Sequence, residues 1–111
     1  MKRTLLLSSL CLALEASAEN YQWQEEMKGS FRKGFLLTCL PAIESQLERA
    51  GVLQLFPQEK RISYCTCVGI KIFDDLTLAE IKRLMDSGDL PARKQSARPR
   101  YSNECADSEL T

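Results

Sequence analysis

Residues 61–73 read RISYCTCVGIKIF and carry two cysteines, Cys65 and Cys67, one residue apart. Two periodicities compete in this stretch. The alternate positions from 62 to 72 are mostly β-branched or aromatic, which is typical of a strand. Positions 61, 65, 68 and 72 instead form one stripe of a helix, on which Gly69 would let a neighbour approach closely. In a strand the two sulfurs share a face, whereas in a helix they point about 200° apart.

The start of the chain has the layout of a secretory signal peptide. Lys2 and Arg3 precede an apolar run at residues 5–14, and small residues at positions 16–18 precede Glu19. This layout predicts a signal peptide over residues 1–18, with cleavage near Ala18. The apolar run is about half of the roughly 20 residues that a membrane-spanning helix needs. We therefore expect a periplasmic or secreted protein without a transmembrane segment.

The charge of the exported chain is nearly balanced. Losing Lys2, Arg3 and Glu15 reduces 15 basic and 15 acidic residues to 13 and 14, a net charge near −1. Such a balance does not favour a general polyanion binder, so no nucleic-acid partner is expected. The remaining chain suits one small domain, which buries only about 60 to 65% of its unfolded surface and gains much from cross-links.

Four cysteines remain after the predicted cleavage: Cys39, Cys65, Cys67 and Cys105. An even number in an exported chain predicts a disulfide framework. A direct bond between Cys65 and Cys67 would close a small strained ring, so each should pair with either Cys39 or Cys105, and both pairings stay open.

The spacing C-x25-C-x-C-x37-C is not that of a zinc site, and we expect no metal and no cofactor. A thiol-redox or metal-carrier protein that uses the C-x-C motif is the alternative interpretation.

The sequence before the C-x-C motif predicts a polar N-terminal lead-in followed by one helix. Residues 19–30 are polar and are expected to be loosely held, although Trp23 could pack. A helical stripe follows, and Gly51 should end it; its apolar members are Leu36, Leu40, Ile43 and Leu47. Pro41 lies within this stripe, so a kink or a new helix beginning near Thr38 is expected.

Beyond the C-x-C motif the clearest signal is a capping box. Thr77-x-x-Glu80 predicts a helix over residues 78–87 that ends at Gly88 in the left-handed conformation. The apolar face of this helix should consist of Leu78, Ile81, Leu84 and Met85.

Residues 92–100 contain four cations and no acid, and they predict an exposed basic loop. Its cations are Arg93, Lys94, Arg98 and Arg100. Attachment to an anionic surface through these residues is a second alternative function. Residues 106–111 are expected to form a disordered tail.

Signs of catalysis are absent from the sequence. The chain has no histidine, which removes the commonest general base and the Ser-His and Cys-His nucleophiles. Asp74 and Asp75 directly precede the predicted capped helix, where negative charge favours the helix dipole. We therefore expect a protein-binding module and not an enzyme, in one form an inhibitor or immunity-type partner of an exported enzyme.

Several motifs together resemble a known group of proteins. They are Phe35-x3-Cys39, Tyr64-Cys65-x-Cys67-Val68, Leu76-Thr77-x2-Glu80-Ile81 and the final Cys105. This pattern resembles the small exported four-cysteine helical proteins of Gram-negative bacteria, a largely uncharacterised group. The resemblance covers residues 31–105 and implies that the C-x-C motif lies on a helix. It also implies that one sulfur is bonded to the first helix and the other to the C-terminal segment. With it, the expected fold is a mainly α domain of three or four helices cross-linked by two disulfides.

Overall fold

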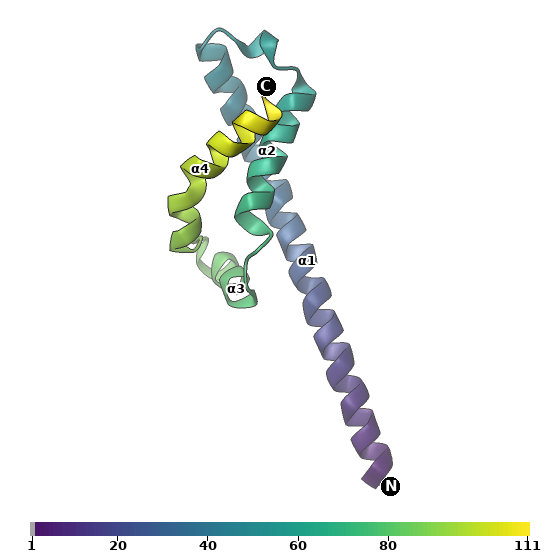
Figure 1. Ribbon diagram of the computed structural model, residues 1–111. Coiled ribbons are helices and arrows are strands. Elements are labelled where there is room, and N and C mark those ends of the chain that lie inside the picture. Colours follow the sequence, from purple (N-terminus) through teal and green to yellow (C-terminus); the bar gives the residue numbers. More distant parts are fainter. Residues whose placement is uncertain (1) are drawn as a thin grey trace.

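All secondary-structure elements of the described chain are helices (Figure 1). The structure, a computed structural model, describes the backbone of residues 2–111 and the side chains of residues 21–111. The elements in order are α1 (Lys2–Arg49), the short 3₁₀-helix η1 (Leu53–Leu55), α2 (Gln58–Phe73), α3 (Leu78–Ser87) and α4 (Ala92–Glu109). No strand occurs among the described residues, and the predicted mainly α class with two disulfides is confirmed.

The C-x-C stretch lies on α2, which decides between its two periodicities and confirms the helix. Cys65, Val68 and Ile72 are buried along one side of this helix. Gly69 is also buried, and a Cβ placed there would lie only 3.3 Å from Cδ1 of Phe35. The absence of a side chain at Gly69 therefore lets α1 approach α2 closely, as the helical pattern predicted.

Helix α1 is longer than the sequence indicated, and neither the loosely held lead-in nor a new helix near Thr38 is found. It continues through residues 19–30, and the partly buried Trp23 and Met27 of this segment pack against the core. It also continues through Pro41, so no new helix begins near Thr38. Pro41 deprives the carbonyl of Leu37 of its helical donor, but both residues are exposed, and water can bind that carbonyl. The predicted signal peptide, residues 1–18, lies outside the residues whose side chains are described.

The loop after α1 and the start of α3 follow the sequence signals. Gly51 has a φ of +75° just after the end of α1. Thr77 and Glu80 form a reciprocal capping box, in which Thr77 N donates to Glu80 Oε1 at 2.9 Å and Glu80 N donates to Thr77 Oγ1 at 3.2 Å. Gly88 ends α3 with a φ of +75°. Ile81 of α3 is fully buried, whereas Met85, expected on the same apolar face, is 49% exposed.

Helix α4 replaces both the predicted basic loop and the predicted disordered tail. Residues 92–100 form its first half, in which Lys94 and Ala97 are buried. Its second half reaches Glu109, and Leu110 just beyond it packs against the core. Both predictions failed because the segment has almost no large apolar residues, while the acids that neutralise Arg93 and Lys94 come from other elements.

The helices are arranged around α2. Helix α1 packs along one side of α2 and α4 along another, while α3 contacts α1 near the end of α2 (Figure 1). The N-terminal part of α1 projects away from the other helices. The core lies between the four α-helices, and its buried members include Val68, Ile72, Phe73, Ile81 and Cys105. Helix α2 is thus the element that both disulfides and most of the packing hold in place.

Candidate functional site

The two cysteines of the C-x-C motif belong to different disulfides. Cys65 is bonded to Cys39 of α1, and Cys67 is bonded to Cys105 of α4, with a Cα–Cα distance of 5.8 Å in each bridge. The pairing left open by the spacing is therefore Cys39–Cys65 with Cys67–Cys105. Among the described residues no group of three or more potential ligands is placed to hold a metal ion.

The contact between α1 and α2 is apolar. Phe73 of α2 stacks on Phe31, with ring centroids 5.7 Å apart, and meets Phe35 edge-on at 6.1 Å. An ion pair between Arg32 and Asp74 borders these rings. This aromatic packing, together with the close approach at Gly69, joins α1 to α2 independently of the Cys39–Cys65 bond.

The contact between α2 and α4 is polar by comparison. The Tyr64 hydroxyl lies 2.5 Å from Ser102 Oγ, and Lys71 Nζ lies 3.0 Å from Glu104 Oε2. The Cys67–Cys105 bridge lies on the same side of α2. Tyr101, Ala106 and Leu110 also pack against the core from this side. The contact thus combines apolar packing with hydrogen bonds and partly exposed ion pairs.

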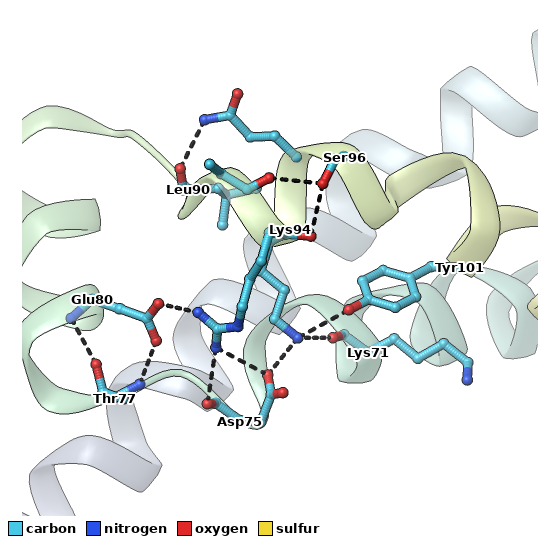
Figure 2. Close-up of polar contacts among 11 residues, drawn as sticks. Lys71, Asp75, Thr77, Glu80, Leu90, Lys94, Ser96 and Tyr101 are labelled. Atoms are coloured by element: carbon cyan, nitrogen blue, oxygen red, sulfur yellow. Dashed lines mark hydrogen bonds and ion pairs between the residues drawn. The ribbon is translucent and has the colours of Figure 1, made fainter.

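Lys94 is the centre of a polar cluster between α4 and the end of α2 (Figure 2). Its side chain is only 2% exposed. Its Nζ donates to the Lys71 carbonyl at 2.7 Å and to the Tyr101 hydroxyl at 3.2 Å, and it forms an ion pair with Asp75. The hydrogen bond from Lys94 lowers the pKa of Asp75 below its ordinary value of 3.8. The buried ammonium thus has a full set of partners, which indicates a structural role.

Arg93 connects the start of α4 to the capping box of α3. Its guanidinium forms an ion pair with Glu80, the same carboxylate that caps the helix (Figure 2). The hydrogen bond from Arg93 is the largest cause that lowers the pKa of Glu80 below its ordinary value of 4.5, and the backbone N–H of Thr77 adds to it. The same hydrogen bond raises the pKa of Arg93. One carboxylate therefore both starts α3 and fixes α4.

The four cations predicted as a surface site are not gathered on one surface. Lys94 points inward, and Arg93 is paired with Glu80. Arg100 lies 5.4 Å from the centre of the Tyr101 ring and 3.6 Å from Glu104. Within the described residues, Arg98 alone of the four is both exposed and without an ion pair. The structure does not bring these residues together for anion binding.

An apolar groove on the outer face of α2 is the feature that the sequence interpretation missed. Ile62 and Ile70 are 37% and 43% exposed, and they lie two helical turns apart. The groove between them has a volume of about 260 Å³, and its lining residues are Ile62, Ser63, Thr66, Cys67, Ile70 and Glu109. The signal was present in the sequence, since positions 62, 66 and 70 follow at helical spacing beside the buried stripe.

A larger cavity, about 400 Å³, lies beside the connection from α1 to α2 and includes Arg61, Glu48 and Phe56. Arg61, the only cationic residue that lines it, already forms an ion pair, because its Nη1 atom lies 2.9 Å from Glu44 Oε1. The Nε atom of Arg61 has no hydrogen-bond partner, but it is buried and out of reach of a bound molecule. The groove on α2 is therefore the better candidate for a contact site.

None of the described helices is long and apolar enough to cross a membrane. Comparisons with models of protein families, with curated proteins and with solved structures gave no match.

Proposed function

We propose that this chain is a small periplasmic or secreted protein-binding module without catalytic activity, which binds another exported protein through the outer face of α2. Inhibition or immunity toward an exported enzyme is one concrete form of this function. The predicted signal peptide at residues 1–18 and the two disulfides support an oxidising compartment outside the cytoplasm.

The observation that carries this proposal is the exposure of Ile62 and Ile70 on a helix that is fixed on both sides. A helix anchored by a disulfide to α1 and by another to α4 loses little conformational entropy when a partner binds it. Two large apolar side chains with a groove between them can form the water-excluded centre of an interface with such a partner. Glu109 supplies a polar edge to the groove.

The paired polar side chains around Lys94 favour a binding function over a catalytic one. The buried Lys94 and the carboxylates of Asp75 and Glu80 are satisfied by one another and by the backbone. They lie beside α3 and the end of α2, and none of them lines the groove.

The test is a pull-down with the oxidised protein from an envelope or secreted fraction. The wild type is compared with the double variant Ile62→Asp/Ile70→Asp and with Leu55→Asp. Leu55 is 64% exposed on η1, outside the groove, and serves as the matched control. We expect one protein to be captured by the wild type and the control and lost with the double variant. Equal capture by all three proteins, or no capture, would contradict the proposal.

A further inference from the structure

The groove on α2 contains one half of a disulfide. Cys67 lines it together with Ile62 and Ile70, and Cys67 is partly exposed. Its partner Cys105 has no exposed surface. In the other bridge Cys65 is also fully buried and Cys39 is partly exposed, but neither of them lines the groove. A molecule in the groove therefore meets the Cys67 side of the Cys67–Cys105 bond, while the Cys105 side is covered by protein.

We infer that the groove is a thiol-exchange site, at which an exported dithiol protein forms a mixed disulfide with Cys67. This inference rests on the proposed binding function of the same face and names the chemistry of the partner. The isoleucines would contact apolar side chains around the partner's cysteine. Glu109 at the edge favours a partner with a cationic side chain beside that cysteine, which also increases the thiolate fraction of its thiol.

The exchange proceeds in two balanced steps. The partner's thiolate attacks Cys67 Sγ, a new S–S bond forms, and the electron pair of the broken Cys67–Cys105 bond leaves on Cys105 Sγ, which takes up a proton. The second thiol of the partner then loses its proton and attacks the partner's own sulfur in the mixed disulfide. Cys67 leaves as a thiolate and is protonated. The protein gains two electrons and two protons, and the partner dithiol becomes a disulfide.

Opening this bridge has a local structural consequence. Helix α4 packs on α2, and Arg93 links its start to Glu80 of α3. Once the bond is reduced, α4 is held by these contacts, by the core packing of Tyr101 and Leu110, and by polar links such as Tyr64–Ser102 and Lys71–Glu104. Helices α1 and α2 keep their aromatic packing and their own disulfide. Exchange at Cys67 thus loosens α4 and leaves the rest of the fold joined.

The first test measures the order in which the two bridges are reduced. The oxidised protein is exposed to limiting dithiothreitol, free thiols are alkylated at intervals, and the modified peptides are identified by mass spectrometry. We expect Cys67 and Cys105 to be alkylated several-fold faster than Cys39 and Cys65, because thiol exchange depends on access to the attacked sulfur and Cys67, unlike Cys39, lines the groove. Equal rates or the opposite order would overturn the inference.

The second test traps the mixed disulfide with a dithiol oxidoreductase of the thioredoxin fold whose resolving cysteine is changed to serine. The adduct is expected on Cys67, several-fold less abundant with Ile62→Asp/Ile70→Asp and unchanged with Leu55→Asp. The three proteins should show the same helix content by circular dichroism, which controls for folding. An adduct on Cys39, or one that does not depend on the isoleucines, would refute docking in the groove.

The two proposals fail in different ways. If the pull-down depends on Ile62 and Ile70 while the Cys67–Cys105 bond resists thiols, the exchange site is refuted and the binding function stands. If the adduct forms on Cys67 without any stable non-covalent partner, the binding function is refuted instead.

Discussion

The two sides of α2 carry the same covalent link and both have ion pairs, but they differ in their aromatic packing. On the α1 side, the Cys39–Cys65 bond is accompanied by three packed aromatic rings and a close approach at Gly69. On the α4 side, the Cys67–Cys105 bond is accompanied by hydrogen bonds and partly exposed ion pairs. Apolar burial contributes more to stability than exposed ion pairs do. The first contact should therefore survive loss of its disulfide, whereas the second depends on it.

The largest loss of stability is expected from a substitution in the aromatic contact between α1 and α2. Phe73→Ala removes a ring that is 7% exposed and packs against Phe31 and Phe35. It should lower the free energy of unfolding by about 3 to 5 kcal/mol, measured by urea denaturation. Leu55→Ala is the control and should change it by less than about 0.5 kcal/mol. A loss below about 1 kcal/mol for Phe73→Ala would show that the aromatic cluster does not hold α1 on α2.

Removing each disulfide compares the two sides directly. In the chain-entropy account the separations of 26 and 38 residues correspond to about 3.5 and about 3.9 kcal/mol. The two bridges should therefore contribute similar free energies of unfolding, but their removal should affect different parts of the structure. Cys67→Ser/Cys105→Ser should lose hydrogen-exchange protection throughout α4, while Cys39→Ser/Cys65→Ser should retain protection between α1 and α2.

A uniform loss of protection in both disulfide variants would refute this difference. It would mean that the two contacts unfold as one cooperative unit.

A smaller loss is expected at the polar cluster. Lys94→Ala leaves the Lys71 carbonyl without its donor and Asp75 without its main cationic partner, so unfolding should become easier by about 2 kcal/mol. Lys82, an exposed lysine of α3, provides the matched control, and Lys82→Ala should be nearly neutral. Equal effects in thermal denaturation would place Lys94 on the surface of α4 and contradict its burial.

The smallest effect depends on pH. Because Arg93 and Thr77 lower the pKa of Glu80 below 4.5, its ionised form stabilises the folded state. This contribution is complete above about pH 4.5 and is lost as the pH falls through the lowered pKa of the folded state. The difference in unfolding free energy between the wild type and Glu80→Gln should therefore be present at pH 7 and shrink in strongly acidic solution. A difference that is independent of pH would assign the effect to packing.

Local signals in the sequence predicted the features that depend on neighbouring residues. The capping box of Thr77 and Glu80 marks the start of α3, and the even number of cysteines indicates two bridges. The helix over residues 92–109 could not be predicted in this way. Two of its cations, Arg93 and Lys94, are neutralised by Glu80 and Asp75, which are 13 and 19 residues away in the sequence, and a disulfide adds to its few apolar contacts. The groove was missed because the exposed isoleucines were considered only as strand residues.

The opposite directions of Cys65 and Cys67 bear on how the oxidised protein assembles. Once α2 has formed, Cys65 faces the side where α1 packs and Cys67 faces the side where α4 packs, so neither can reach the other's partner. The mispaired isomer would require α1 and α4 to exchange sides of the helix. The geometry of one helical turn thus allows only one pairing of the four thiols. Early formation of α2 should therefore let oxidation reach this pairing with little need for a disulfide isomerase.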